Sequence, residues 1–190
     1  MLDDINNTEE NQIHIRHAYL EEYEAAVSVS LQSCQQSKGI ETSVSRKTTA
    51  QWIRDATSLK YGGELLVATN HIGIVGATVY HTPNSMPAEV VPRNWASMSI
   101  LTVLPDFRNN GIGKRLCTNC IDLARIDQAK YLGVAVSPEM VDAILFFEAL
   151  GFVKTKYQKL LRQKQYFQYR FSVRKRIVTP CQKKSCSACR

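Results

Sequence analysis

The spacing of apolar residues predicts that the first part of the chain runs strand, helix, helix, strand, strand. Alternating apolar and polar residues indicate a strand, whereas apolar residues recurring every three or four positions indicate an amphipathic helix. Thr48 and Gln51 have the spacing of a capping box, which marks the start of the second helix. The predicted elements are a strand at 13–16, a helix at 19–36, a helix from 48 to the glycines at 62–63, and strands at 64–68 and 74–80 joined as a hairpin.

The second part of the chain alternates strands with helices. Residues 96–104 are apolar on both faces, as expected of a central strand covered by helices. Ser137 as N-cap, Pro138 at the first helical position and Glu139 in the first turn predict the start of a helix that stops at Gly151. The predicted elements are a strand at 96–104, a helix after Gly111, a strand at 131–136, a helix at 138–150, and two strands within 152–177.

The order β-α-α-β-β-β-α-β-α-β-β predicts one α/β domain with a mixed central sheet flanked by helices. With 190 residues and 44% apolar residues, the chain can build a sizeable core. We expect residues 1–12 to form a flexible lead and residues 13–178 to form the domain. Residues 179–190 read as a basic, cysteine-containing, disordered tail, because they have no apolar periodicity.

A glycine-containing turn joins the predicted central strand to the following helix. A helix that begins near Gly111 has unpaired N–H groups and the positive end of its dipole there, which together suit an anion. Gly111 and Gly113 allow close approach to the backbone, and Arg108, Lys114 and Arg115 add positive charge. The turn therefore predicts a pyrophosphate site.

Two motifs in order resemble the GNAT (GCN5-related) N-acetyltransferase superfamily. Residues 103–113, with Val103, Pro105, Arg108, Gly111 and Gly113, resemble its R/Q-x-x-G-x-G/A signature after a V-x-P strand end. Residues 143–152, AILFFEALGF, resemble its A-x-x-x-Y-E-x-x-G-F helix. The glycine pattern matches neither a dinucleotide fingerprint nor a Walker loop.

This resemblance implies transfer of an acetyl group from acetyl-CoA, as co-substrate, directly to a primary amine of a small molecule or protein. It also implies that the central strand and the strand after the glycine-rich turn and helix splay apart, so that unpaired backbone groups bind the pantetheine arm. The implied cofactor-binding residues are Leu101, Thr102 and Val103 for the arm, and Arg108, Asn109, Asn110, Gly111, Ile112, Gly113 and Lys114 for the pyrophosphate.

The expected catalytic positions depart from the family pattern, so the resemblance identifies no acid or base. Phe147 stands where the family often has a tyrosine that acts as the catalytic acid, and Met140 stands where an asparagine is common. The central strand offers Ser97, Ser99 and Thr102 but no carboxylate. Replacement acids could be Tyr131, Tyr157 or Tyr166, and replacement bases could be Glu64 or His81. For Phe147 itself we expect a place in the core.

Basic charge is concentrated at the C-terminal end. Twelve of the 24 Lys and Arg residues follow Glu148, but none of the 17 Asp and Glu residues do. The region suits nucleic acid, an anionic surface or coenzyme A phosphates, although no nucleic-acid module accompanies it. The polar N-terminus and the lack of a long apolar run predict a cytoplasmic protein without a membrane span. A monomer and a homodimer both remain open.

Six cysteines allow two zinc hypotheses. Cys117 and Cys120 have zinc-ligand spacing, but they fall in a predicted helix where a thiol can be a small core residue. Cys181, Cys186 and Cys189 lie in the tail, where metal binding or lipidation are alternatives to disorder. We predict no metal site.

Three functions are compatible with the sequence. The first is an acetyl-CoA-dependent amine N-acetyltransferase, and the second is an acyl-CoA-binding GNAT-like regulatory protein without turnover. The third is a nucleic-acid-associated protein that uses the basic C-terminal region. The acceptor and the acyl-chain preference cannot be inferred from the sequence.

Overall fold

The computed structural model describes residues 12–35, 51, 54–55, 62–85, 89–161 and 164–173. Its strands are β1 His14–His17, β2 Gly63–Asn70, β3 Gly73–His81, β4 Ala96–Val103, β5 Tyr131–Val136, β6 Val153–Leu161 and β7 Lys164–Ser172. Its α-helices are α2 Tyr23–Gln35, α4 Ile112–Ile126 and α5 Val141–Ala149, and its 3₁₀ turns are η1 Leu20–Glu22 and η3 Pro105–Phe107.

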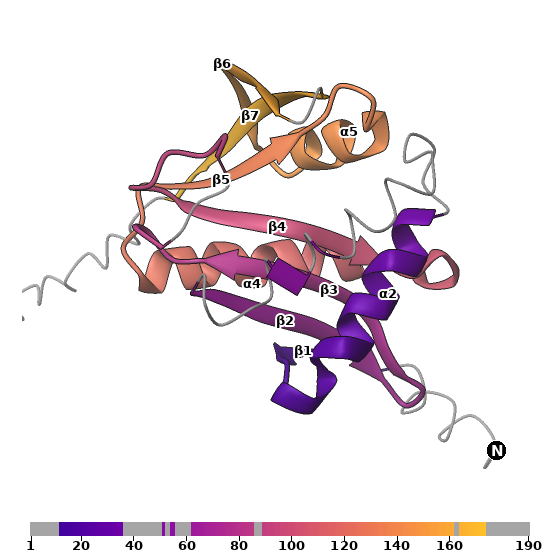
Figure 1. The fold of residues 1–190 in the computed structure, drawn as a ribbon. Helices are drawn as coiled ribbons and strands as arrows, with labels where there is room; N and C mark the ends of the chain where they lie inside the picture. Colours follow the sequence, from indigo (N-terminus) through magenta and orange to yellow (C-terminus); the bar gives the residue numbers. More distant parts are fainter. Residues whose placement is uncertain are drawn as a thin grey trace, which may run out of the picture.

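The strands form one mixed seven-stranded sheet in the order β1-β2-β3-β4-β5-β7-β6. Only β4 and β5 are parallel, and every other neighbouring pair is antiparallel. In Figure 1, α2 crosses one face of the sheet, whereas α4 lies behind the opposite face. The predicted α/β class and mixed sheet with flanking helices are confirmed.

Two apolar clusters fill the two sides of the sheet. On the α2 side, buried residues of α2 such as Val27 pack on Val67 of β2 and Val79 of β3. On the other side, Leu116 of α4 and Phe147 of α5 pack in the larger cluster. Alternate residues of β2 and β3 therefore face opposite clusters, as the two-residue period of a strand requires.

The predicted boundaries are confirmed for the strand at 131–136. The hairpin of β2 and β3 is also confirmed, but both strands extend beyond the predicted 64–68 and 74–80. The first predicted helix is split, because a 3₁₀ turn at Leu20–Glu22 precedes α2. The predicted second helix lies largely outside the described residues. Within the described part of the chain, no helix combines the length and the apolar character needed to cross a membrane.

The predicted start of α5 at Ser137 is wrong. Ser137 is buried, and its carbonyl accepts a hydrogen bond from the Met140 N–H at 3.0 Å. This contact closes a separate turn after β5, and the helix begins only at Val141, with Met140 as N-cap. The favourable sequence of Ser137, Pro138 and Glu139 therefore forms the turn before the helix, because the end of β5 fixes Ser137 in the core.

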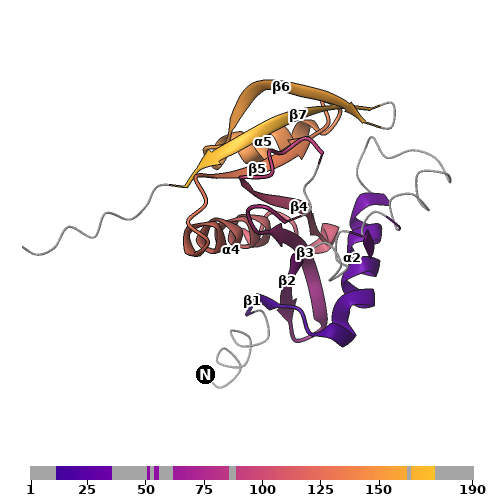
Figure 2. The ribbon, with the colours of Figure 1, turned by 60° about the vertical axis from the view of Figure 1, so that its left-hand side comes forward.

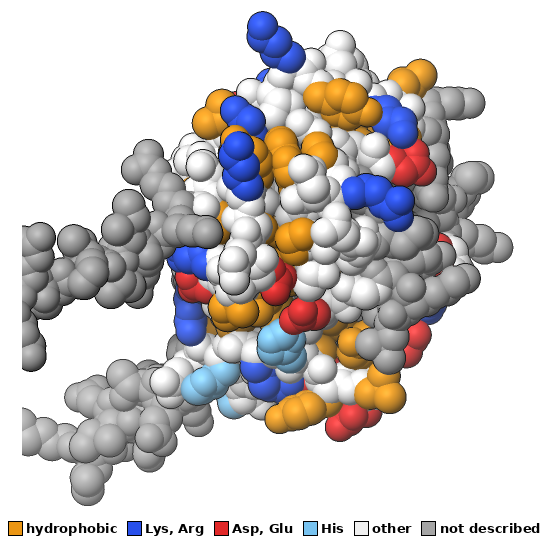
Figure 3. Space-filling model, turned by 90° about the vertical axis from the view of Figure 1, so that its left-hand side faces the viewer, with side chains coloured by type: hydrophobic (Ala, Val, Ile, Leu, Met, Phe, Trp, Pro, Cys, Tyr) orange, Lys and Arg blue, Asp and Glu red, His pale blue; other side chains and the backbone are white. Residues whose placement is uncertain are grey.

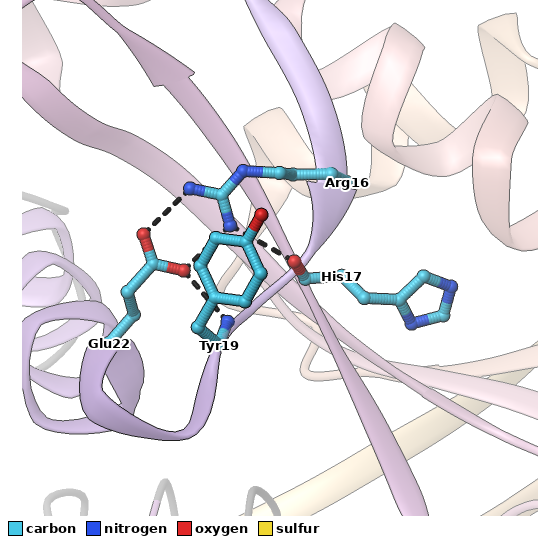
Figure 4. Close-up of polar contacts among 4 residues, drawn as sticks. All are labelled: Arg16, His17, Tyr19 and Glu22. Atoms are coloured by element: carbon cyan, nitrogen blue, oxygen red, sulfur yellow. Dashed lines mark hydrogen bonds and ion pairs between the residues drawn. The ribbon is translucent and has the colours of Figure 1, made fainter.

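A polar clip fixes the connection from β1 to α2. Arg16 donates two hydrogen bonds of 2.7 Å to the carboxylate of Glu22, and the Tyr19 N–H donates to the same carboxylate at 2.8 Å (Figure 4). The Arg16 guanidinium also lies 4.4 Å from the centre of the Tyr19 ring. The hydrogen bonds from Arg16 lower the pKa of Glu22 to about 2. Because both side chains are partly exposed, this pair stabilises the fold only modestly.

Replacing Glu22 with Gln should destabilise the protein by about 1 kcal/mol at pH 7, because solvent screens the ion pair. A lowered carboxyl pKa contributes stability above the ordinary value of 4.5 and loses it as the pH falls toward 2. Urea unfolding should therefore show a smaller loss of stability between pH 5 and pH 2 for Glu22→Gln than for the unmodified protein. Glu21→Gln, at the exposed neighbouring residue, is the control and should behave like the unmodified protein.

Candidate functional site

The central parallel strands β4 and β5 meet at one end and separate at the other. Their paired residues are Ala96 with Leu132 and Ser97 with Gly133, and no further pair joins the described strands. Figure 1 shows them close together at the left and diverging to the right, and Figure 2 shows the same separation from a second side. The edge of β4 beyond Ser97 therefore faces away from β3 without a strand partner, as the GNAT resemblance implies.

A β-bulge lies in the part of β4 that has no β5 partner. Ile100 and Leu101 together stand opposite Thr78, and Ile100 has a φ angle of 56°. A β-branched residue rarely adopts this left-handed conformation, so surrounding contacts must hold it. The Thr78 hydroxyl donates to the Ser99 carbonyl at 3.2 Å, and the Ile100 side chain is buried on the α2 side. The bulge therefore redirects the backbone of β4 at mid-strand.

The glycine-containing turn lies at the open end of β4 and leads into α4. Gly111 is the N-cap of α4 with a φ angle of 73°, and Asn109 has a φ angle of 63°. No side chain of the described residues caps the helix, and its first turn holds no acidic residue. A Cβ atom placed on Gly111 would have no neighbour within 4 Å. The first N–H groups of α4 therefore face an uncrowded position where an anion can bind.

The cations of this turn differ in what they contact. Arg108 donates from Nε to the Val103 carbonyl and from Nη2 to the Ser33 carbonyl, both at 3.1 Å. Arg115 donates to the Ile13 carbonyl at 2.8 Å, whereas Lys114 is exposed. Arg108 thus ties the C-terminal turn of α2 to the end of β4, and it occupies one carbonyl of the segment 101–103 that we predicted to bind the pantetheine arm.

The second motif helix packs against the first. A Cβ atom on Gly113 would lie 3.5 Å from the Phe146 ring and 3.9 Å from Val103, so this glycine allows α4, α5 and β4 to approach one another. Phe147 is 6% exposed and makes edge contacts with Phe146 and Phe152, at 5.3 and 5.2 Å between ring centres. The predicted core position of Phe147 is confirmed, and this ring has no group that can donate a proton.

The structure does not bring the three candidate tyrosines together at the unpaired edge of β4. Tyr131 lies at the start of β5, where its ring contacts Trp95 at 4.7 Å and Arg170 at 4.7 Å. Tyr157 is 47% exposed on the edge strand β6. Tyr166 pairs with Lys159 near the turn of the β6–β7 hairpin.

The candidate bases Glu64 and His81 lie on opposite faces of the sheet. Glu64 pairs with Tyr80, whose ring belongs to the α4-side cluster, and its carboxylate lies 3.5 Å from His17. His81 shares the α2 face with Val79, and its Nε2 atom lies 3.1 Å from the Ser99 hydroxyl. The two side chains therefore cannot act at the same position.

His81 is a buried imidazole with one unsatisfied nitrogen. Its residue is 6% exposed, and its Nδ1 atom has no hydrogen-bond partner among the described residues. Burial lowers the pKa of His81, so the ring is neutral at neutral pH. An unpaired buried polar atom costs about 1–3 kcal/mol, and such groups are uncommon in native proteins. His81 is predictable as a candidate from the sequence, but its contact with Ser99 is not, because that contact depends on the register of β3 against β4.

Another polar contact on the same face was not anticipated. Ser30 of α2 and Thr102 of β4 are joined by a hydrogen bond of 3.1 Å. Ser30 is buried, so this contact fixes α2 over the end of β4. Ser99 and Thr102 thus form a polar line along the bulged strand, and only the pattern of hydroxyl residues in β4 hinted at it.

The cysteines of α4 are core residues. Cys117 and Cys120 are both fully buried in the α4-side cluster. Burial raises the pKa of Cys117 to about 12 and also raises that of Cys120. Both thiols therefore stay protonated, which is unfavourable for a zinc ligand. The tail cysteines at 181, 186 and 189 lie outside the described residues.

Exposed cations on β6 and β7 account for the described part of the basic region. Lys154, Lys156 and Arg170 are exposed, whereas Lys159 and Lys164 form ion pairs with Glu89 and Glu139. Lys154 also lies over the Phe167 ring. Figure 3 shows Lys and Arg side chains among hydrophobic ones on the upper part of this view.

Solved structures with the same fold include several acetyltransferases. A GNAT-family acetyltransferase from Staphylococcus aureus Mu50 has a TM-score of 0.66 and 18% identity, and the match covers 86% of this chain and 100% of that one. YncA from Salmonella typhimurium, solved with its cofactor acetyl-CoA, has a TM-score of 0.61 and 19% identity over 86% and 95% of the two chains. PaiA N-acetyltransferase from Thermoplasma acidophilum, in complex with coenzyme A, has a TM-score of 0.64 and 17% identity over 84% and 99%.

No curated protein matches this chain. At these identities the solved structures establish the fold alone. The sequence pattern of the acetyltransferase (GNAT) family matches residues 15–152, which span β1 to the end of α5 and include both motifs. Because this match covers well over half of the sequence, the chain belongs to the GNAT acetyltransferase family.

Proposed function

We propose that this protein transfers the acetyl group of acetyl-CoA to a primary amine by direct attack of the amine on the thioester. The observation that carries the proposal is the two-residue pairing of β4 with β5, which leaves the edge of β4 available beside the uncapped start of α4. An arm bound along β4 as an added strand would end near the bulge when its pyrophosphate lies at Gly111. Family membership supports the same assignment.

The chain offers polar groups to the pyrophosphate and to the pantetheine arm of this co-substrate. The N–H groups at the start of α4 and the side chain of Lys114 suit the pyrophosphate. Unpaired backbone groups of β4 between Ser99 and Val103 suit the amides of the pantetheine arm. Arg108 positions this edge through its bonds to Val103 and Ser33, rather than by pointing a free cation at the ligand.

Thiol release from acetyl-CoA with a panel of primary amines tests the proposed transfer. Amine-dependent release, with the acetylated amine found by mass spectrometry, is the expected result. Tight acetyl-CoA binding without release for any amine would instead favour the acyl-CoA-binding regulatory protein. The third function compatible with the sequence, nucleic-acid binding, predicts an affinity for nucleic acid that falls steeply as the salt concentration rises. A titration with duplex DNA or RNA at several salt concentrations measures this.

Gly111→Asp should weaken acetyl-CoA binding at least tenfold, about 1.4 kcal/mol, because it places a carboxylate near the pyrophosphate. The control is Gly111→Asn, which has the same size but no charge. Both side chains tolerate the φ angle of 73°, and a Cβ atom at this position meets nothing within 4 Å. Calorimetry of the two folded variants should therefore give different affinities, and equal affinities would place the pyrophosphate elsewhere. Gly113→Asp is less informative, because it also disturbs packing on Phe146.

A further inference from the structure

His81 lies close to the point where β4 and β5 separate. Ser97 pairs with His81 on one side and with Gly133 on the other, and Ser97–Gly133 is the last pair between the two parallel strands. His81 therefore lies one strand away from the vertex of the separated strands. Ser99 lies two residues farther along β4, about 7 Å from Ser97, on the unpaired part of the strand.

Ser99 connects the buried imidazole to the unpaired segment of β4. Ser97 and His81 are buried, whereas Ser99 is half-buried and contacts His81 Nε2 through its hydroxyl at 3.1 Å. From Val103 back to Ser99 is four residue steps, about 13 Å along the strand. If the arm of the co-substrate follows β4 from the glycine turn, its thioester end lies beside the Ser99 hydroxyl.

Among the described residues, the strand neighbours of His81 bring no charged side chain to its ring. Its strand neighbours Gly63, Ser97 and Ser99 carry no titratable side chain. The buried residues of α2, Ala26, Val27, Ser30 and Ser33, carry none either. Tyr23 packs against the same cluster at the start of α2, and Cys34 is partly buried near its end. Glu64, on the neighbouring strand β2, lies on the α4 face beside His17. Glu24 of α2 forms an ion pair with Arg54.

We propose that the Ser99 hydroxyl and the His81 imidazole form a proton relay for the acceptor amine. This inference rests on the proposed acetyl transfer. The amine lone pair forms the C–N bond at the thioester carbonyl, and the C–S bond breaks with its electron pair on sulfur. The extra proton on the amine nitrogen passes to the Ser99 oxygen as the hydroxyl proton passes to His81 Nε2. His81 then returns this proton through Ser99 to the thiolate.

The relay assigns a role to each nitrogen of the ring and to the missing family tyrosine. It uses the tautomer with its proton on Nδ1, so that Nε2 accepts from Ser99, and Nδ1 is the nitrogen without a described partner. It also supplies the leaving thiolate with a proton, although Phe147 replaces the tyrosine that many GNAT members have at that position. Ser99 is the group that meets the substrate, and His81 acts through it.

The test compares four variants in acetyl-CoA turnover with the best amine of the panel. His81→Gln and Ser99→Ala should each lower kcat about 100-fold, while the Kd for acetyl-CoA stays unchanged. Ser99→Thr keeps a hydroxyl and should retain most activity. Ser97→Ala is the matched control, because Ser97 lies on the same face and has no hydrogen bond to His81 among the described contacts.

Two pH measurements separate a relay from a structural role. In the unmodified protein, kcat/KM should fall as the pH drops through a value below 6.5, and this limb should vanish in His81→Gln. The amine ionises near pH 8 or above, so its own limb is distinct. Because burial lowers the pKa of His81, the neutral ring favours the folded state fully above 6.5, and that stability is lost as the pH falls below 6.5. The melting temperature of His81→Gln should lack this dependence.

A folded His81→Gln or Ser99→Ala variant with unchanged kcat would overturn the relay while leaving the proposed acetyl transfer intact. Persistence of the lower pH limb in His81→Gln would do the same. If the unmodified protein bound acetyl-CoA but acetylated no amine, the proposed function and the relay would both be wrong.

Discussion

Phe147→Ala should destabilise the protein by about 3–5 kcal/mol, because it removes an aromatic ring from a packed core. Phe147 is 6% exposed and makes edge contacts with Phe146 and Phe152, and Phe152 in turn contacts Phe171 of β7. The lost ring therefore loosens the packing of α5 on the β7 side of the sheet. For a domain of this size, we expect the melting temperature to fall by roughly 10 °C.

Leu145→Ala is the control for this substitution. Leu145 lies on the same helix but is 60% exposed, so its truncation should change the free energy of unfolding by less than about 1 kcal/mol. Phe147→Tyr keeps the ring and adds a hydroxyl at the position of the family tyrosine. It should fold, and it should raise turnover if a proton donor at this position limits the rate. An unchanged melting temperature for Phe147→Ala would contradict the core position.

The elements that the sequence predicts correctly are those with strong local patterns. The strand at 131–136 is apolar throughout because α4-side residues cover one face and Val91 and Trp95 lie on the other, and its boundaries match β5. The hairpin of β2 and β3 follows from two apolar runs on either side of a short polar turn. The start of α5 was mispredicted because serine is a common N-cap residue, whereas the position of Ser137 at the buried end of β5 decides its structure.

In the candidate site, too, the local features are predictable from the sequence and the contacts between distant residues are not. The turn around Gly111 is local, so glycine spacing and the strand before it predict its conformation at the start of α4. The contact of His81 with Ser99 is not local, because it depends on the register of β3 against β4. Arg108 was expected to supply charge to the phosphates, but its bonds to Val103 and Ser33 depend on where α2 ends in space. Pairwise geometry of this kind has no periodic signal in a sequence.

The largest effect should come from removing β7. β7 is central to the second half of the sheet, because it pairs with β5 along six residues and with β6 on its other edge. β5 has only two paired residues on its β4 side, so β7 supplies most of its strand pairing. A chain that ends at Gln165 would leave β5 and β6 without this partner. It would also remove Tyr169, which is 1% exposed, and so expose the core residues that pack against this ring. We expect insoluble protein.

A chain that ends at Val178 is the matched truncation and should be soluble. It keeps β7 and also Val173, which is buried and whose N–H donates to the Lys130 carbonyl at 3.1 Å. Residues 179–190 lack apolar periodicity, so we predict that they add nothing to the domain. Its melting temperature and its acetyl-CoA affinity should therefore equal those of the full chain. The tail zinc hypothesis predicts the opposite, because metal binding and folding are coupled. Stoichiometric zinc in the full chain, with a lower melting temperature after chelation or truncation at Val178, would show that Cys181, Cys186 and Cys189 belong to the folded structure.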